Sequence, residues 1–287
     1  MRTLAIDIGG TKIALGFVEN GELIQRTQIS TPTARNVNQF SQAILVHADQ
    51  WIEHVDNIGV STTGLVTKDG ISAINPDTLA FPTPFPLGQA LEAITKKPVS
   101  ILNDAQAAAW YEYTVLESHH RNMAFITVST GVGGGIILDG KLHRGLDGLA
   151  GHIGHMVIDS TGPECGCGQI GCVEAIASGT AIQKTSNSLF FPTITNIELF
   201  NQANSNPKAE EIISNSAEAI ATLCCNLKAC LDLDVIVLGG GVGLAKGYLD
   251  RVSKAIKTRP SAFQIPVIEA LGNYDACLLG AAYQFKE

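Results

Sequence analysis

Residues 3–18 read TLAIDIGGTKIALGFV, and this stretch decides the fold. The apolar runs Thr3–Ile8 and Ile13–Val18 flank a Gly-Gly pair, which predicts two strands joined by a glycine turn. A Glu-Asn-Gly-Glu segment then leads into a third run, Glu22–Ile29, and an Asn-Gly pair between such runs is a strong hairpin signal. The chain therefore begins as strand, glycine turn, strand, tight turn, strand.

The same succession restarts near residue 123. A strand, a glycine turn, a strand and an Asp-Gly turn are expected at Met123–Ser129, Thr130–Gly135, Ile136–Leu138 and Asp139-Gly140, with a further strand from Lys141. This second copy predicts an internal duplication with a boundary near residues 117–122. We therefore expect an N-terminal α/β domain of residues 1–118 and a larger C-terminal α/β domain of residues 119–287.

Helices and strands alternate through the rest of the chain. Helices are predicted at Val37–His54, Ala105–Glu117 and Tyr274–Phe285, and they dominate between the loop 159–171 and Asp232. Further strands are predicted at Ile58–Ser61, Val99–Leu102, Val235–Leu238 and Ile265–Ile268, and the proline-rich stretch Asn75–Leu87 is expected to be loop. Interleaved strands and helices indicate an α/β architecture, in which the last helix could also pack back on the N-terminal domain.

Charge and composition argue against several classes of function. The 287 residues include 19 Lys and Arg against 27 Asp and Glu, a net charge of −8, and 45% are hydrophobic. Nucleic acids and membrane surfaces attract basic proteins, so neither is an expected partner. No apolar run is long enough for a transmembrane helix. The N-terminal residues also lack the longer apolar core of a signal peptide. Seven cysteines, an odd number, suit a reducing compartment, and we expect a cytoplasmic protein.

Two glycine-rich turns are candidate phosphate loops. They are Asp7-Ile8-Gly9-Gly10-Thr11-Lys12 and Ser129-Thr130-Gly131-Val132-Gly133-Gly134-Gly135. Glycine lets the backbone approach a phosphate, Thr11 and Lys12 supply a hydroxyl and a charge, and Asp7 is placed to hold a Mg²⁺-bound water. One such loop could be a plain hairpin, whereas two in similar halves are what a clamp on both ends of a polyphosphate requires.

Two other nucleotide motifs fit less well. Gly135–Lys141 matches G-x-x-x-x-G-K, but Leu142 replaces the Mg²⁺-binding Ser or Thr and the intervening residues have strand character. Val235–Gly247 resembles a dinucleotide fingerprint, but only residues 270–287 follow Glu269, too few for the rest of such a sheet. We therefore predict that the backbone of Gly239, Gly240 and Gly241 approaches an adenosine.

The pair Asn103-Asp104 ends one predicted strand and precedes a helix. Both residue types are preferred N-caps, so capping is one role open to Asp104. In α/β sheets ligands gather at the carboxyl ends of strands, where a carboxylate can accept a hydroxyl proton as the oxygen attacks a γ-phosphoryl group. Together with the two phosphate loops, this position favours Asp104 as a catalytic base.

A cysteine cluster points to a metal. His155, Cys165, Cys167 and Cys172 are spaced H-x9-C-x-C-x4-C in a loop rich in Gly and Pro. Three thiolates and one imidazole make a closed tetrahedral set suited to structural Zn²⁺. Free thiols or a Cys165–Cys167 disulfide are alternatives, and His152 is another possible fourth ligand. The remaining cysteines are expected to fill the core: Cys224, Cys225, Cys230 and Cys277.

These motifs, in this order and over nearly the full chain, resemble the ROK family of sugar kinases within the sugar kinase/Hsp70/actin superfamily. The resemblance implies a two-domain, actin-like, hexokinase-type ATPase fold with ATP, Mg²⁺ and structural Zn²⁺ as cofactors. It implies ATP phosphate segments made of Ala5, Ile6, Asp7, Ile8, Gly9, Gly10, Thr11 and Lys12, and of Gly131, Val132, Gly133, Gly134, Gly135, Ile136, Ile137 and Leu138. It implies that Asp104 is the base and that His155 and the cysteines at 165, 167 and 172 bind zinc. It also implies a sugar site that includes Gly64, Asn75, Asn103, Asp104, His152, His155 and Glu174.

One departure from the family bears on the substrate. Hexose-specific members usually have a glutamate three residues before the zinc histidine, where this chain has His152. A glutamate can accept hydrogen bonds from two adjacent hydroxyls, whereas a neutral imidazole offers one acceptor and one donor. The change speaks against glucose, and with segments 103–110 and 172–179 the chain is similar to members that phosphorylate O6 of N-acetylmannosamine in sialic acid breakdown.

Other outcomes stay open within the resemblance. N-Acetylglucosamine, glucose and allose are alternative substrates. The family also contains sugar-sensing repressors, but these carry a helix-turn-helix ahead of the kinase-like body, and here the phosphate motif begins at Asp7. The resemblance further implies a homodimer, for which the helical region 207–232 offers apolar surface, although packing within the subunit explains that surface equally well.

Overall fold

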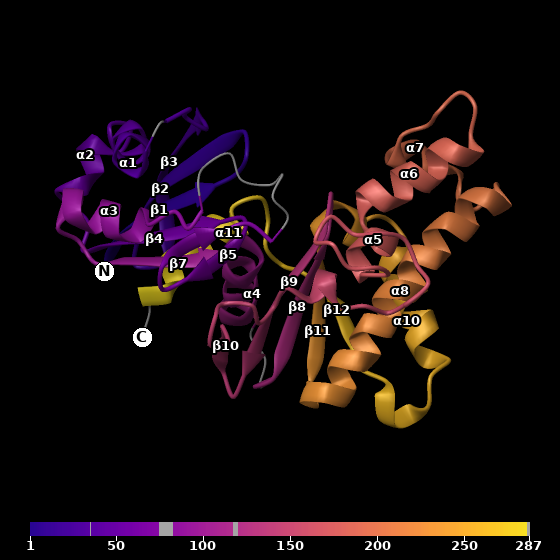
Figure 1. Ribbon diagram of the computed structural model, residues 1–287. Helices are drawn as coiled ribbons and strands as arrows, with labels where there is room; N and C mark the ends of the chain where they lie inside the picture. The colour runs from indigo at the N-terminus through magenta and orange to yellow at the C-terminus, as the bar shows by residue number, and fades with distance from the viewer. Residues whose placement is uncertain (35, 75–82, 117–119, 286–287) are drawn as a thin grey trace. The chain divides into compact units, whose positions relative to one another are not determined.

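The computed structural model describes residues 1–34, 36–74, 83–116 and 120–285 (Figure 1). The predicted sugar contact Asn75 and most of the predicted loop 75–87 lie outside these residues. The chain forms two compact units, of which the first comprises Met1–Leu116, Arg144–Ala150 and Gly272–Glu287, and the second Glu117–His143 and Gly151–Leu271. The first unit thus includes two segments that follow the predicted boundary at residue 118.

The first unit is built on a five-stranded sheet in the order β3-β2-β1-β4-β7. These strands are β1 Arg2–Ile8, β2 Lys12–Glu19, β3 Glu22–Ser30, β4 Asn57–Thr62 and β7 Val99–Asn103. The pairs β1–β2 and β2–β3 are antiparallel, as the two short turns require, whereas β1, β4 and β7 are parallel. The carboxyl ends of β1, β4 and β7 therefore meet at one edge of the sheet.

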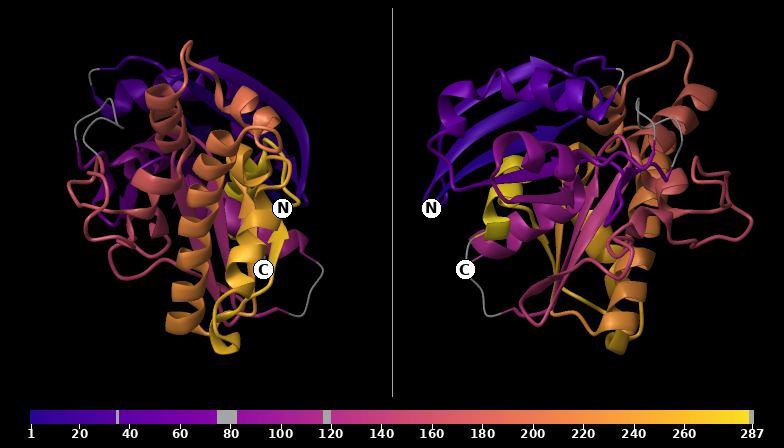
Figure 2. Two further views of the ribbon diagram at one scale, coloured as in Figure 1. Left: turned by 90° about the vertical axis from the view of Figure 1, so that its right-hand side faces the viewer. Right: turned by 60° about the vertical axis from the view of Figure 1, so that its left-hand side comes forward.

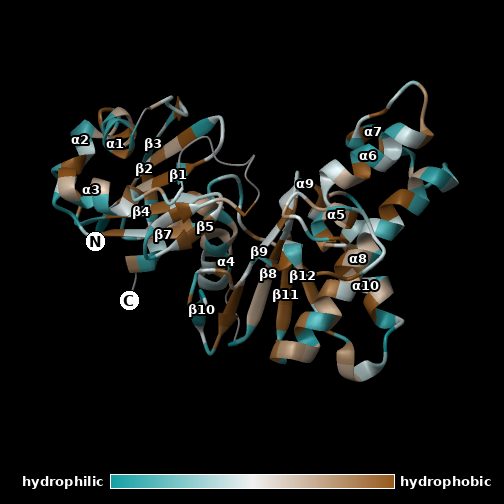
Figure 3. Cartoon of the chain, in the orientation of Figure 1, coloured by the Kyte–Doolittle hydropathy of each residue, from teal (hydrophilic) through white to brown (hydrophobic). Residues whose placement is uncertain are grey.

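The second unit repeats this arrangement. Its sheet has the order β10-β9-β8-β11-β12, with β8 Met123–Val128, β9 Val132–Leu138, β10 Lys141–His143, β11 Val235–Gly239 and β12 Val267–Glu269. The pairs β8–β9 and β9–β10 are antiparallel, and β8, β11 and β12 are parallel. The predicted duplication is therefore confirmed, and hydrophobic residues run along the strands of both sheets (Figure 3).

Helices cover the first sheet on both faces. They are α1 Val37–Leu45, α2 Asp49–Ile52, α3 Leu87–Thr95, α4 Asp104–Val115 and α11 Ala276–Ala282, and the short strands β5 Leu65–Thr67 and β6 Gly70–Ser72 form a separate hairpin. The last helix packs on α4, β1 and β4. A Cβ at Gly59 would lie 2.2 Å from the Ala281 oxygen, and one at Gly280 would lie 1.8 Å from the Ala107 oxygen, so these glycines permit the close approach.

The prediction of one helix over Val37–His54 is wrong. The chain leaves the helical path after Leu45 and starts again at Asp49. This break turns Trp51 into the core, where its ring lies 6.4 Å from that of Phe17 and its Nε1 donates to Gln25 on β3. A buried indole N–H needs a hydrogen-bond acceptor, and in the observed path Gln25 Oε1 is that acceptor for Trp51.

The second unit packs its helices around a core of its own. They are α5 Val173–Ala177, α6 Gly179–Leu189, α7 Asn196–Gln202, α8 Pro207–Leu231, α9 Gly240–Gly243 and α10 Tyr248–Lys257, with short 3₁₀ turns η2 Ile153–His155 and η3 Ser261–Phe263. The long helix α8 packs along α10 (Figure 2). Its apolar side chains, such as Ile213, Ile220 and Leu223, lie in the core of this unit, which accounts for the apolar surface noted at residues 207–232.

Two of the cysteines expected in the core are there, and one is not. Cys224 and Cys225 are buried on α8. Cys230 is exposed, because it lies in the last turn of α8 on the side that faces solvent, so its prediction as a core residue is wrong. Cys277 on α11 is half-buried. No helix among the described residues has both the length and the apolar character needed to cross a bilayer.

Candidate active site and metal centre

Three strand ends bring polar side chains together in the first unit. Asp7 lies at the end of β1, Ser61 at the end of β4, and Asn103 at the end of β7, and the parallel register pairs Asp7 with Ser61 and Thr62 with Asn103. The Ser61 hydroxyl donates to Asp7 Oδ1 over 2.7 Å. Ser61 was predicted only as the end of a strand and not as a site residue, although a polar residue at that position is a usable signal.

Asn103, and not Asp104, caps helix α4. Its side-chain oxygen accepts from the backbone N–H groups of Ala105 and Gln106, and its amide nitrogen donates to the Gly64 oxygen over 3.0 Å. Asp104 is the first residue of α4, and its carboxylate accepts from Ala105 N over 2.8 Å. Because Asn103 supplies the cap, the Asp104 side chain retains acceptor capacity for another partner.

Both carboxyl groups at this edge have raised pKa values, and the charge of Asp7 contributes to the shift of Asp104. Burial raises the pKa of Asp104 to about 6, the hydrogen bond from Ala105 opposes the shift, and the charge of Asp7 adds to it. Burial also raises the pKa of Asp7, against which the Ser61 hydrogen bond acts. The Cys277 thiol lies in the field of both carboxylates, and burial together with their charge raises its pKa. A carboxylate with a pKa near 6 is suited to accept and release a proton near neutral pH.

The first glycine loop is open at its tip. Gly9 N donates to the Lys12 oxygen over 3.0 Å, and the Thr31 hydroxyl donates to the Gly9 oxygen over 2.8 Å. Gly10, Thr11 and Lys12 are exposed, and a Cβ at Gly10 would meet nothing within 4 Å. The strand residues Ala5, Ile6 and Ile8 have buried side chains that belong to the core. A phosphate can therefore reach the tip of the loop but not the side chains of these three strand residues.

The second glycine segment is mostly strand, which corrects the prediction of a turn over Thr130–Gly135. The turn is confined to Ser129–Gly131, and β9 begins at Val132. A Cβ at Gly134 would lie 2.3 Å from Ile153 Cδ1, and one at Gly154 would lie 1.9 Å from the Val132 oxygen. The glycines thus permit the segment with His152 and His155 to lie directly on β9. Ile136, Ile137 and Leu138 follow as strand residues, so this stretch is not a P-loop.

Glu174 links the metal loop to this turn. It lies in the first turn of α5, two residues after Cys172, and its Oε2 accepts from Val132 N over 3.0 Å. The same oxygen lies 2.5 Å from where a Cβ on Gly131 would be. The predicted sugar contact Glu174 and the predicted phosphate turn are therefore in direct contact.

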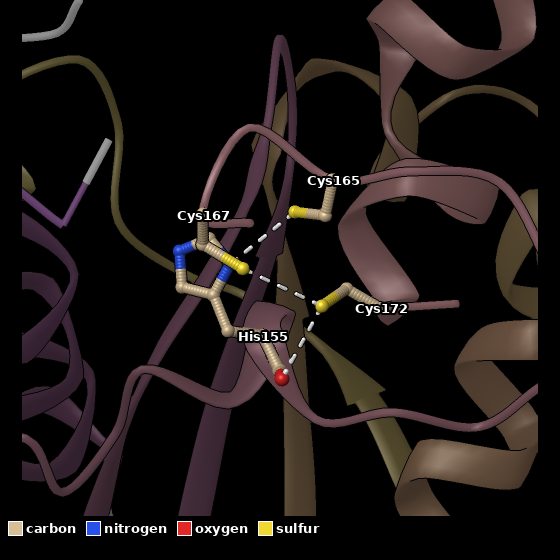
Figure 4. A group of neighbouring side chains, drawn as sticks. All are labelled: His155, Cys165, Cys167 and Cys172. Atoms are coloured by element: carbon tan, nitrogen blue, oxygen red, sulfur yellow. Dashed lines mark hydrogen bonds between the residues drawn. The ribbon is translucent and has the colours of Figure 1, made fainter. Parts of the chain in front are cut away.

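The side chains of His155, Cys165, Cys167 and Cys172 converge (Figure 4). One ligand atom from each lies within 4.8 Å of all the others. Cys167 Sγ and Cys172 Sγ are 3.7 Å apart, and Cys165 Sγ is 3.6 Å from His155 Nδ1. In a tetrahedral zinc site with Zn–S bonds of 2.3 Å, sulfurs are about 3.8 Å apart, so the spacing fits this ion.

The chemistry of the four residues also fits a divalent cation. Burial and the neighbouring thiols raise the pKa of Cys172 to about 12, because three thiolates cannot crowd together without a positive charge among them. Gln169, which was not among the predicted site residues, holds the group from outside, because its amide nitrogen donates to the His155 backbone oxygen and to Cys167 Sγ. A glutamine in a loop gives no sequence signal for such a role.

His152 stays outside this cluster. The structure brings His155, three residues later, to the sulfurs. His152 Nε2 is buried and has no hydrogen-bond partner among the described residues. Burial lowers the pKa of His152 to about 4, so its imidazole is neutral near pH 7.

A cavity of about 720 Å³ lies beside the third glycine segment. Gly241 lines it, together with Asn196, Phe200, Lys246, Asp250 and Arg251. Gly239 and Gly240 pack against β8 instead, since a Cβ at Gly240 would lie 2.4 Å from the Val128 oxygen. Of the three glycines predicted near an adenosine, only Gly241 therefore borders the cavity, and the other lining residues were not predicted.

Residues 3–287 match the sequence profile of the ROK family. The chain belongs to the ROK family. This ROK protein is 67% identical over 287 residues, with 100% of both chains covered, to a Vibrio cholerae protein named N-acetylmannosamine kinase. It is 47% identical over 281 residues, 97% of this chain and 96% of the other, to a Yersinia pestis protein of the same name.

The solved structures agree with this family. The ROK hexokinase of Thermus thermophilus matches 98% of this ROK protein and 97% of its own chain, with a TM-score of 0.86 and 32% sequence identity. The predicted actin-like, hexokinase-type fold is therefore confirmed, as is the resemblance to the ROK family.

Proposed function

We propose that this ROK protein is an ATP-dependent kinase that phosphorylates O6 of N-acetylmannosamine, a step of sialic acid breakdown. The observation that carries the proposal is Asp104, a carboxylate with a pKa near 6 beside Asp7 at the carboxyl edge of the first sheet. The substrate follows from the 67% identity, over the full length, to a protein named N-acetylmannosamine kinase.

Asp104 is assigned the role of base. Its carboxylate accepts the proton of the sugar O6 while O6 forms its bond to the γ-phosphorus. The bond from that phosphorus to the β–γ bridging oxygen breaks, and ADP leaves with the electron pair. Asn103 fixes the start of α4 and bonds the Gly64 oxygen, so the sugar-binding groups proposed for this edge are held in one frame with the base.

The nucleotide is assigned to the glycine loops and the cavity. Thr11 and Lys12 are exposed at the tip of the first loop, and the backbone of Gly131 and its neighbours forms the second. The cavity beside Gly241 is large enough for an adenosine and offers the Phe200 ring and polar groups to it. Bound Mg²⁺ would neutralise charge on the β- and γ-phosphates, and Asp7, oriented by Ser61, is the residue that we assign to its water shell.

Zinc is assigned to the site formed by His155, Cys165, Cys167 and Cys172. A site closed by four protein ligands leaves no position for a reacting group, so the role is structural. Nδ1 of His155 faces Cys165, which leaves its other ring nitrogen for a hydrogen bond to the sugar. The ion would thereby fix the segment that carries both His155 and Glu174, the two sugar contacts assigned to this loop.

A coupled ADP-release assay across N-acetylmannosamine, N-acetylglucosamine, glucose and allose tests the substrate. We expect the highest kcat/KM with N-acetylmannosamine. A matched His152→Glu variant should move the preference toward glucose, since a glutamate can accept two hydrogen bonds from adjacent hydroxyls. A wild-type preference for another hexose would replace the proposed substrate, and specific operator binding in a gel-shift titration would favour a regulator instead.

The proposed homodimer is tested by sedimentation equilibrium.

A further inference from the structure

Helix α4 carries two polar side chains that are almost fully buried. Gln106 is 2% exposed and Glu112 is 1% exposed, in a helix otherwise rich in alanine. Burial of an amide or a carboxyl group is costly unless the group is hydrogen-bonded, so the hydrogen-bond partners of these side chains indicate their role in the fold. Both side chains bond to the main chain of segments that are distant in sequence.

These partners lie where the chain passes between the two compact units. Gln106 Nε2 donates to the Gly148 oxygen over 3.3 Å and to the Ala150 oxygen over 2.7 Å, and Ala150 ends the middle segment of the first unit. Glu112 Oε1 accepts from Gly272 N over 2.7 Å, and Gly272 begins the last segment of that unit. A third passage, at which the chain leaves the first unit after Leu116, directly follows the end of α4.

The fourth passage is held on the strand that leads into α4. Arg144 begins the middle segment, and its guanidinium donates to the Ile101 oxygen on β7. Every passage between the units is therefore fastened either to α4 or to the strand directly before it. The first residue of that helix is Asp104.

We propose that Gln106 and Glu112 are positioning residues for phosphoryl transfer, which tie the orientation of Asp104 to the passages between the units. This inference rests on the proposed function. A helix is stiff over three turns, so a bond in its last turn constrains the direction of its first residue. Misplacing a reacting group by about 1 Å can lower the rate by about 10²-fold. Loss of either bond should therefore lower kcat, whereas loss of a bond elsewhere in the unit that costs the same stability should not.

Variants of equal length separate positioning from mere stabilisation. Gln106→Met and Glu112→Met remove the hydrogen bonds at similar side-chain volume, whereas Glu112→Gln keeps an oxygen acceptor for Gly272 N. The matched control is Thr3→Val, which removes the buried 2.6 Å bond to Asn57 in the same unit but touches neither α4 nor a passage. Each variant is measured for melting temperature, for kcat, and for KM of sugar and of ATP.

We expect the two methionine variants and Thr3→Val to lower the melting temperature by similar amounts. Only the methionine variants should lower kcat, by about tenfold or more with ATP KM within about threefold, and Glu112→Gln should restore kcat to within about threefold of wild type. Full kcat in both methionine variants would overturn the proposal, as would an equal loss in Thr3→Val. If the methionine variant at one position fails to fold, the variant at the other position still tests the proposal.

Amide hydrogen exchange gives a readout that does not depend on the reaction. In Glu112→Met, faster exchange at Gly272 accompanied by faster exchange in the first turn of α4 supports the proposal. Faster exchange at Gly272 alone contradicts it. If the wild-type protein fails to phosphorylate N-acetylmannosamine, the proposed function fails, while the exchange result still decides whether these bonds hold the helix.

Discussion

At the scale of single residues, the properties of Asp104 come from its neighbours. Asn103 takes the capping role that either residue of the pair could fill, and burial together with the charge of Asp7 raises the pKa of the Asp104 carboxyl to about 6. The residue type supplies only a carboxyl group, whereas its surroundings raise the pKa so that the group gains and loses a proton near neutral pH.

Replacing Asp104 by Asn should lower kcat by about 10²–10⁴-fold and leave sugar affinity within a few-fold, because the base contributes to the reaction more than to binding. Asp69→Asn, at an exposed position away from this edge, is the control and should leave kcat unchanged. Steady-state kinetics and sugar titration measure both. Near-normal turnover of the Asp104 variant would show that another group takes the proton.

The raised pKa of Asp104 also predicts a pH profile. The base must be ionised, so kcat/KM of the wild type should fall about tenfold for each pH unit below about 6 and level off above it. Had the pKa stayed at its ordinary value of 3.8, the fall would begin some two units lower. An acid limb that starts below pH 5, measured with coupling enzymes in excess, would contradict the assignment.

Cys167→Ser tests the metal site. A serine hydroxyl is a poor zinc ligand, so zinc content should fall and the loop with His155 and Glu174 should lose order, raising the sugar KM by about tenfold or more. Cys230→Ser, at the exposed thiol of α8, is the matched control. Metal analysis with steady-state kinetics checks both. An unchanged KM in a zinc-free protein would separate the metal from sugar binding.

At the scale of elements, glycine in β9 decides where the metal loop lies. Gly134 and Gly154 let the segment 151–155 rest on the strand with its backbone nearly in contact. The same strand begins at Val132, whose N–H bonds Glu174. Turn, strand and metal loop thus form one packed group, although Val132 and Glu174 are 42 residues apart in the sequence.

Gly134→Ala should destabilise the protein by about 1–3 kcal/mol, because its Cβ would lie 2.5 Å from the fixed Phe125 oxygen as well as against Ile153. The control is Gly241→Ala, where a Cβ meets nothing within 4 Å, and it should change stability by less than about 0.5 kcal/mol. Urea unfolding followed by circular dichroism compares them. Equal stability of the two variants would refute the close packing.

At the scale of the whole molecule, the first unit is assembled from three separate stretches of chain. The last of them supplies α11 and the residue after it, and Leu278, Ala282 and Tyr283 pack with Ala5, Ala14 and Val18 of the sheet. The same stretch packs on α4 as well as on β1, β2 and β4. The unit therefore depends on the end of the chain for its core.

A chain that ends at Leu271 should consequently lose the fold of the first unit and all kinase activity, whereas a chain that ends at Phe285 should keep both. The second unit contains all four proposed metal ligands and its own core, so the shorter chain should still bind zinc. Thermal melts and metal analysis test this. An unchanged melting temperature for the chain that ends at Leu271 would contradict the dependence.

The sequence by itself determined the features that rest on local pattern. Apolar runs and glycine turns predicted the repeated strand order, and the cysteine spacing predicted the metal cluster but left His152 and His155 both possible as its fourth ligand. The tertiary structure alone decided the break before Trp51, the bond of Ser61 to Asp7 and the anchoring of Gln106 and Glu112. Each depends on a partner brought near by folding, and neither residue type nor spacing records which distant backbone group a side chain will meet.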